Sequence, residues 1–162
     1  MAVKKLVLNQ LFEETNYTLI GIHCSLEDYR LAYLLNKHLN INLKRNELDL
    51  DYNNGKVLYS IFEWEDSKQL ITWNMVSNSC KLEFFDVIRQ DSLFSNKEKI
   101  SQTHYLVPEY KTVNYLLKID NEHSAFNKEK YILGEILKIA QIITAYSINV
   151  SQLKSKDNLI FN

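Results

Sequence analysis

The stretch that most constrains the fold is residues 47–64, which read ELDLDYNNGKVLYSIFEW. Asn54-Gly55 at its centre predicts a two-residue hairpin turn, because both residue types tolerate the positive φ of a type I′ turn. A turn at this place sets three pairs of apolar residues opposite one another on one face: Tyr52 with Val57, Leu50 with Tyr59, and Leu48 with Ile61. Strands joined this tightly form an antiparallel sheet, since parallel strands need a crossover of a dozen residues or more.

Several other segments are rich in β-branched and aromatic residues and end at turn-forming residues. They predict further strands at 17–24, 70–78, 80–88, 103–107 and 112–119. The polar stretch 89–102 between two of them is expected to be a long loop. Residues 25–39 follow the first predicted strand and repeat leucines at helical spacing, so they predict a helix.

The last apolar segment, 127–148, is predicted to be one long helix. Its apolar stripe consists of Ile132, Leu133, Ile136, Leu137, Ala140 and Ile143, and four further residues widen it: Tyr131, Ile139, Ile142 and Tyr146. A stripe this wide suits a helix gripped by a curved sheet or shared with a protein partner or a second copy of the chain. We therefore expect an α+β fold, in which an antiparallel sheet of about five to seven strands packs against a long C-terminal helix, with a second helix after the first strand.

The length of 162 residues fits a single domain, 1–162, which buries roughly 70% of its unfolded surface. Residues 1–15 and 151–162 are expected to be terminal arms. The second arm ends in Leu159, Ile160 and Phe161, which are costly to expose and are predicted to dock on the body or on a partner. The apolar run near the N-terminus is too short for a signal peptide or a membrane span, so we expect a cytoplasmic protein with no membrane partner.

The charge balance and the scarcity of glycine argue against several function classes. Nineteen basic and twenty acidic side chains give a net charge of −1, so nucleic-acid binding is disfavoured. Three glycines leave no phosphate-binding loop, and the four histidines form no metal or catalytic motif. Cys24 and Cys80 are expected to be free thiols. No cofactor, metal or catalytic residue is indicated, and nothing positive supports an enzyme.

Two groups of side chains leave a functional interpretation open. Glu47, Asp49 and Asp51 alternate along one strand, so they share a face that could hold a cation. Acidic residues at this spacing are more often solvated and protect a strand from edge pairing. Trp64 and Trp73, on neighbouring predicted strands, could line a pocket or a stacking platform, although filling the core is the more frequent role of such residues.

The only proline of the chain lies in the stretch VPEYKTVNY, Val107–Tyr115. Proline cannot donate to a sheet ladder, so Pro108 is expected at a strand end, a bulge or an edge. Glu109 could accept backbone N–H bonds across the turn or bind a cation. A conformational corner is favoured over a ligand site.

This stretch resembles the signature of the bacterial IPExxxVDY family. Pro108, Glu109, Val113 and Tyr115 match the signature, whereas Val107 replaces its isoleucine and Asn114 its aspartate; the closing LKSKDNLIF, residues 153–161, also looks like that family. The resemblance implies a cytoplasmic single-domain protein, and it brings no catalytic residue, cofactor or partner with it. Since an amide cannot act as a general base, Asn114 is not expected to transfer protons.

Two hypotheses follow for the function. The first is a non-enzymatic interaction module that binds a protein partner or a second copy through the helix 127–148 and the tail. The alternative is a small-molecule binding domain of helix-grip type, with a pocket of several hundred cubic ångströms between sheet and C-terminal helix. Tyr59, Trp73, Tyr115 and Glu109 are the residues expected near that pocket.

Overall fold

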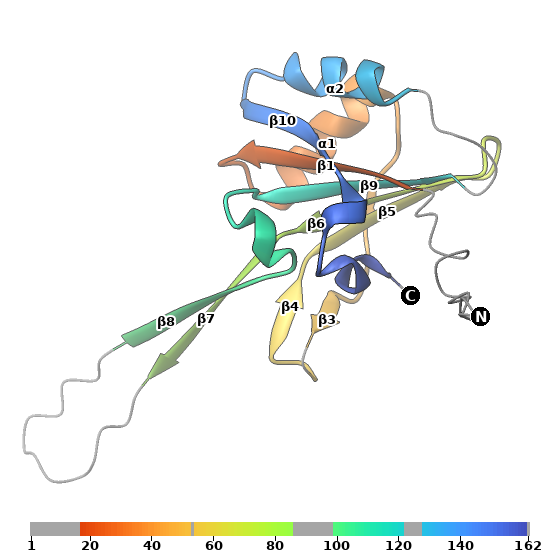
Figure 1. Cartoon of the computed structure of the whole chain (residues 1–162). Coiled ribbons are helices and arrows are strands. Elements are labelled where there is room, and N and C mark those ends of the chain that lie inside the picture. The colour runs from red at the N-terminus through yellow and green to blue at the C-terminus, as the bar shows by residue number, and fades with distance from the viewer. Residues whose placement is uncertain (1–16, 53, 86–98, 122–127, 162) are drawn as a thin grey trace, which may run out of the picture.

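A six-stranded antiparallel sheet is the centre of the fold (Figure 1). The computed structural model describes residues 17–52, 54–85, 99–121 and 128–161. In spatial order the strands are β10 (Ile142–Ile148), β1 (Tyr17–Cys24), β9 (Tyr115–Asn121), β6 (Ile71–Ser77), β5 (Ile61–Asp66) and β2 (Lys44–Arg45). The predicted antiparallel sheet and the α+β class are confirmed.

Two hairpins extend from this sheet. The first pairs β3 (Leu50–Tyr52) with β4 (Val57–Tyr59), and its register matches Leu50 with Tyr59 and Tyr52 with Val57, as predicted. Asn54 and Gly55 have φ values of 53° and 80°, which is the positive φ that the turn requires. The third predicted pair is wrong, because Leu48 is 82% exposed and Ile61 begins β5, which pairs with β2 instead.

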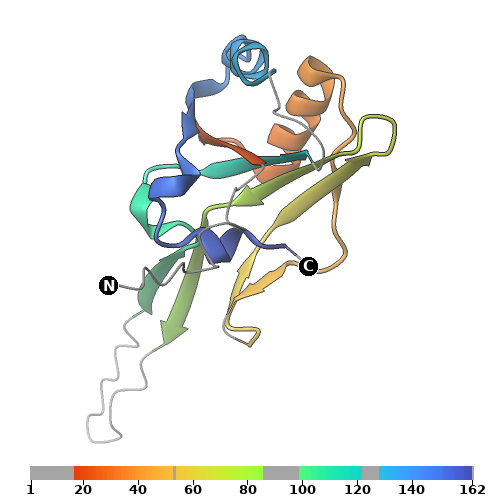
Figure 2. The same cartoon turned by 45° about the vertical axis from the view of Figure 1, so that its right-hand side comes forward.

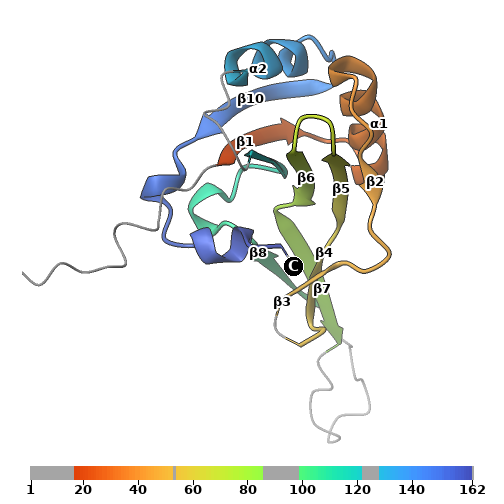
Figure 3. The ribbon, with the colours of Figure 1, turned by 90° about the vertical axis from the view of Figure 1, so that its right-hand side faces the viewer.

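The second hairpin pairs β7 (Ser79–Phe85) with β8 (Lys99–Tyr105). It projects from the body as a two-stranded ribbon (Figure 3). Residues 99–102 were expected in a loop and are part of β8. The rest of that predicted loop, residues 89–98, lies outside the described residues.

The described residues form two α-helices, α1 (Asp28–Leu39) and α2 (Glu129–Leu137). The long helix predicted over 127–148 is therefore wrong: α2 has 9 residues, and the chain turns at Lys138 into β10. Residues 142–148 read IITAYSI, and their β-branched side chains suit a strand better than a helix. Antiparallel pairing with β1 supplies the backbone hydrogen bonds that a longer helix would have supplied. No helix in the described part of the chain is long and apolar enough to cross a membrane.

Both faces of the sheet are covered, and the described residues form a hydrophobic core on each face. The first core lies under α1 and α2 and includes Leu35, Trp73 and Ile136. The second core lies on the opposite face and includes Tyr59, Val107 and Leu159. Figure 2 shows the two helices above the sheet and the last segments of the chain below it.

The C-terminal segment packs on the second core. It contains two short 3₁₀ helices, η3 (Val150–Gln152) and η4 (Lys156–Leu159). Leu159 is fully buried, as expected, whereas Ile160 is 63% exposed. The buried Lys118 of β9 donates from Nζ to the carbonyl oxygen of Leu159 at 3.0 Å, and burial lowers the pKa of this ammonium group. The predicted arm 1–15 lies outside the described residues.

Candidate functional site

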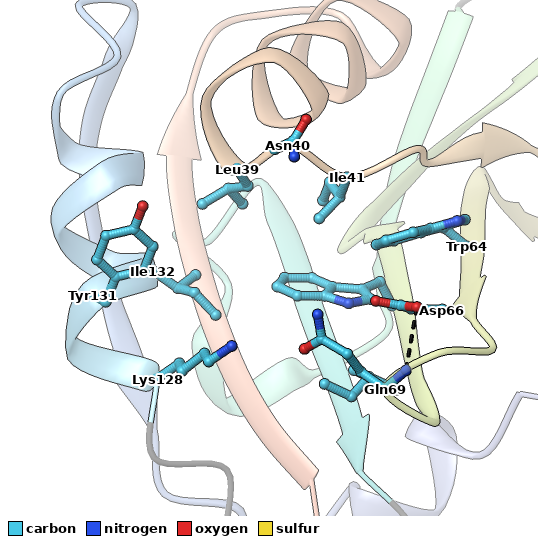
Figure 4. Close-up of a pocket in the computed structure, with 11 residues that line it drawn as sticks. Leu39, Asn40, Ile41, Trp64, Asp66, Gln69, Lys128, Tyr131 and Ile132 are labelled. Carbon is cyan, nitrogen blue, oxygen red and sulfur yellow. Dashed lines mark hydrogen bonds between the residues drawn. The ribbon is translucent and has the colours of Figure 1, made fainter.

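A cavity opens between the sheet and the ends of both helices (Figure 4). Its floor is built by the β5–β6 hairpin, in which Trp64 and Trp73 are direct cross-strand partners. Residues opposite each other in an antiparallel pair share a face, so the two indoles lie side by side. Trp73 is only 6% exposed and belongs to the first core, while Trp64 is partly buried at its edge. Ile71, two residues before Trp73, lines the same floor.

The turn of this hairpin forms one rim of the cavity. The Oδ1 atom of Asp66 accepts the backbone N–H groups of Lys68 at 3.0 Å and Gln69 at 3.3 Å. One oxygen of this carboxylate is therefore committed to the turn. The side chain of Gln69 lies on the rim beside it.

The end of α1 forms one wall. Asn40 caps this helix in the left-handed conformation, with φ 55°, and Ile41 follows it into the cavity wall. The side chain of Asn36 holds the chain that follows, because it accepts the N–H of Leu43 at 2.7 Å and donates to its carbonyl oxygen at 3.0 Å. The backbone of Asn36 adds to this, because its carbonyl oxygen accepts the N–H groups of Asn40 and Ile41.

The first turn of α2 forms the facing wall with Lys128, Tyr131 and Ile132. Ile132 is buried in the first core, whereas the ring of Tyr131 is exposed. Sequence reasoning assigned Tyr131 to the apolar width of a long helix and passed over Lys128. The start of this helix was predicted to within two residues, at 127 instead of Glu129. Because residues beside a helix start often line a site, this start could have pointed to both residues.

The cavity has a volume of about 180 Å³. This is smaller than the several hundred cubic ångströms expected, and it lies between the sheet and two short helices instead of one long helix. Seven of its eleven lining residues are aromatic or aliphatic, and the other four, Asn40, Asp66, Gln69 and Lys128, are polar or charged. Small-molecule sites likewise combine apolar surface with placed polar groups.

Of the four residues expected near a pocket, only Trp73 lines this cavity. Tyr59 is fully buried in the second core, on the other face of the sheet, and burial raises its pKa to about 12. Tyr115 donates its hydroxyl hydrogen to the carbonyl oxygen of Leu26 at 2.7 Å, and burial raises its pKa to about 12 as well. Glu109 belongs to the corner described next.

At the corner Val107–Tyr115, the side chains of Glu109, Asn114 and Tyr115 hydrogen-bond to other segments of the same chain. Pro108 begins the 3₁₀ helix η2 (Pro108–Tyr110), where its missing N–H costs nothing. The Oε1 atom of Glu109 accepts the N–H groups of Lys154 at 2.7 Å and Ser155 at 2.9 Å, and Oε2 accepts the hydroxyl of Ser155 at 2.7 Å. Desolvation raises the pKa of Glu109, but these hydrogen bonds outweigh it and leave the pKa below its ordinary value.

Two asparagines connect this corner to the sheet. The fully buried Asn78 accepts the N–H of Val107 at 2.8 Å and donates to the carbonyl oxygens of Tyr110 at 2.8 Å and Val113 at 3.0 Å. Asn114 accepts the N–H of Cys24 at 3.0 Å through its side-chain oxygen. These contacts support the structural interpretation of the motif, in which Val113 is buried in the second core.

The three alternating carboxylates, Glu47, Asp49 and Asp51, line one open pocket on the surface, and two of them already have partners within the chain. Asp49 forms an ion pair with Arg45, and Asp51 accepts the N–H of Gly55 at 2.6 Å. Among the described residues, no group of three His, Cys, Asp or Glu side chains is arranged to hold a metal ion. Cys24 is a buried free thiol, and Cys80 is a half-buried one.

Comparison with known proteins finds no matching family model, no similar curated protein and no similar solved structure.

Proposed function

We propose that this protein binds a small organic molecule in the cavity between the sheet and the two helices. The observation that carries the proposal is the pair of side-by-side indoles at the cavity floor, with helix ends on both sides. Aromatic surfaces of this kind stack on flat rings, and such contacts contribute about 0.5–1.5 kcal/mol beyond the burial of area. The cavity supplies surface and shape for binding, and we propose binding alone, without a chemical reaction.

Tryptophan fluorescence gives a site-specific test, because the chain contains 2 tryptophans and both line this cavity. A panel of single-ring compounds, including benzamide, benzoate and benzylamine, would be titrated while emission is recorded. We expect saturable quenching by at least one compound and a loss of affinity of about two- to tenfold in Trp64→Leu. Trp64→Leu keeps one tryptophan, so its emission is weaker, and binding to this variant would be measured by NMR chemical shifts.

Tyr33→Leu is the matched control. Tyr33 is an exposed aromatic residue on α1 and does not line the cavity, so its removal should leave the titration unchanged. If no compound of the panel quenches emission or shifts NMR signals saturably, the proposed function is wrong. Equal losses in both variants would also contradict the assignment to this cavity.

A second candidate function is self-association, favoured by the β7–β8 ribbon. One face of the ribbon carries the cross-strand pair Phe84 and Ile100, which are 51% and 48% exposed. The other face is charged, and there Lys99 contacts Glu83 at 2.7 Å. An isolated two-stranded ribbon is marginally stable in water, so a cover over its apolar face would stabilise it.

We propose that a second copy of the chain covers this face. On this face Phe84, Leu82 and Cys80 stand opposite Ile100, Gln102 and His104, and none of these six residues is acidic or a lysine. Leu82 and Cys80 pack against the second core, so two copies would meet through the exposed Phe84–Ile100 end, where no charged side chain is buried. The sequence-based hypothesis assigned self-association to a helix over 127–148. Because residues 142–148 form a strand instead, we propose the ribbon as the contact surface. Light scattering should show a dimer that Phe84→Ser together with Ile100→Ser converts to a monomer, while the control Tyr29→Ser leaves it intact. A monomeric wild-type protein at 100 μM, about the range of weak dimers, would contradict this candidate.

A further inference from the structure

The size of the cavity limits its ligand to about one ring. A cavity of about 150 Å³ lined by apolar side chains holds benzene, and the present volume is about 180 Å³. The floor of paired indoles then selects a flat ring over a branched aliphatic group, since a flat ring can lie against both.

The polar groups around the cavity are unevenly distributed. Figure 4 shows Asp66 beside Trp64 on one side and Lys128 on the other, with the amino group of Lys128 directed toward the side-chain amide of Gln69. One oxygen of Asp66 already accepts two backbone N–H groups of its own turn. The cavity therefore has an acidic side, where one carboxylate oxygen is already engaged, and a basic side.

The basic side is open to a partner. No ion pair of the Lys128 ammonium group is found within the described part of the chain, and its backbone carbonyl oxygen accepts the N–H of Ile132 at 2.9 Å within α2. The amide of Gln69 can donate hydrogen bonds from the same direction. A carboxylate can accept from both groups at once, whereas an ammonium group would be repelled by Lys128.

We infer that the ligand is a small aromatic carboxylate whose single ring lies on Trp64 and Trp73 and whose carboxylate contacts Lys128 and Gln69. This inference rests on the proposed function, because it names the chemical class of the molecule that the cavity binds. The carboxylate points away from Asp66, which sets the orientation of the ring in the cavity.

Three probes of nearly equal shape test the charge preference: benzoate, benzamide and benzylamine. Their affinities would be measured by tryptophan quenching at pH 7 in low salt. Benzoate should bind about two- to fivefold more tightly than benzamide, the range expected for a solvent-exposed ion pair, and benzylamine should bind more weakly than both. Raising the ionic strength should reduce the preference for benzoate and leave the affinity for benzamide unchanged.

Lys128→Met should lower the affinity for benzoate to about that for benzamide, and circular dichroism would show that the variant is folded. Lys130→Met is the matched control, because Lys130 is an exposed lysine of the same helix that does not line the cavity. Equal binding of benzoate and benzamide by the wild-type protein would overturn the inference and leave the proposed function standing. A preference for benzoate that survives in Lys128→Met would overturn the assignment of the contact. Failure of every ring compound would overturn the proposed function itself.

Discussion

Replacing Glu109 by alanine removes a contact between two distant parts of the chain. The carboxylate lies in η2, and it receives the N–H groups of Lys154 and Ser155 and the hydroxyl of Ser155 at 2.7–2.9 Å. Ser155 is the N-cap residue of η4, and its own side chain makes no capping hydrogen bond within that helix. Glu109 thus caps η4 from another segment and holds the C-terminal segment against the second core.

The expected loss follows from what a helix cap contributes. Removing an N-cap side chain costs about 0.5–2 kcal/mol, and three acceptor contacts place Glu109 in the upper half of that range despite its exposure. We expect Glu109→Ala to lower the free energy of unfolding by about 1–2 kcal/mol. In a chain of this size this corresponds to a fall in Tm of roughly 2–8 °C.

The same contact predicts a dependence on pH. The pKa of Glu109 is lower in the folded protein than its ordinary value, which is about 4.3. A carboxylate with a depressed folded pKa adds stability that is fully present above the unfolded pKa and is lost as the pH falls through the folded pKa. The difference in unfolding free energy between wild type and Glu109→Ala should therefore be constant from neutral pH to about pH 5 and shrink below about pH 4.

Urea unfolding followed by circular dichroism measures this difference at each pH. Glu65→Ala is the control, because Glu65 is an exposed glutamate of β5 for which no hydrogen bond or ion pair is found among the described residues. A double-mutant cycle with Ser155→Ala should give a coupling energy of at least about 0.5 kcal/mol. The reasoning is refuted if Glu109→Ala loses no more than Glu65→Ala, or if the difference does not change down to pH 3.

Other substitutions should change the free energy of unfolding by different amounts, and one should raise it, in the same assay. Asn78→Ala strands one N–H and two carbonyl groups in the protein interior and should cost about 2–4 kcal/mol; a loss below 1 kcal/mol would contradict the hydrogen bonding described. Gly21→Ala would place a methyl group 3.0 Å from Val113 and should cost about 1–3 kcal/mol, whereas Gly134→Ala in α2 meets open space and should stabilise by about 0.5–1 kcal/mol. Asn114→Asp keeps the acceptor for the N–H at the end of β1 and should stay within about 0.5 kcal/mol of wild type, while Asn114→Ala should cost about 1 kcal/mol.

Local signals were sufficient where a short stretch determines its own geometry. Asn54-Gly55 gave the turn and two of the three cross-strand pairs, because a two-residue turn determines the register beside it. The register failed at Leu48, since the chain leaves the hairpin there and Ile61 pairs with a different strand. The turn therefore determined the pairing only within β3 and β4, and it did not predict that β5 pairs with β2.

The long helix failed for a related reason. Residues 129–148 carry apolar side chains at spacings that fit a helix and a strand, and a continuous apolar run does not separate the two. What ends α2 is the opportunity for Ile142–Ile148 to pair with β1, a segment more than 100 residues earlier in the chain. Such a contact leaves no local mark in the sequence, apart from the cluster of β-branched residues at Ile142, Ile143 and Thr144.

The candidate pocket was only half predictable because the sheet is covered on both faces. Trp64 and Trp73 were correctly placed as neighbours, since consecutive strands joined by a short turn pair with each other. Tyr59 was assigned to the same pocket, but it faces the second core. Period-two spacing tells which residues of one strand share a face, and it does not tell which faces of different strands coincide.

The separation of the two faces bears on what the Val107–Tyr115 stretch can do. The side chains of Asn114, Tyr115 and Glu109 hydrogen-bond to β1, to the chain between β1 and α1, and to the C-terminal segment, respectively. Val107 and Val113 belong to the second core, whereas the ring of Tyr115 packs against the first core without lining the cavity. The indole pair and Lys128 lie at the helix face. Substitutions in the stretch should therefore change stability and leave the preference between benzoate and benzamide intact, and Lys128→Met should do the reverse. If a variant such as Glu109→Ala altered that preference as strongly as Lys128→Met does, the two faces would be coupled, and the corner would have to be regarded as part of the binding site.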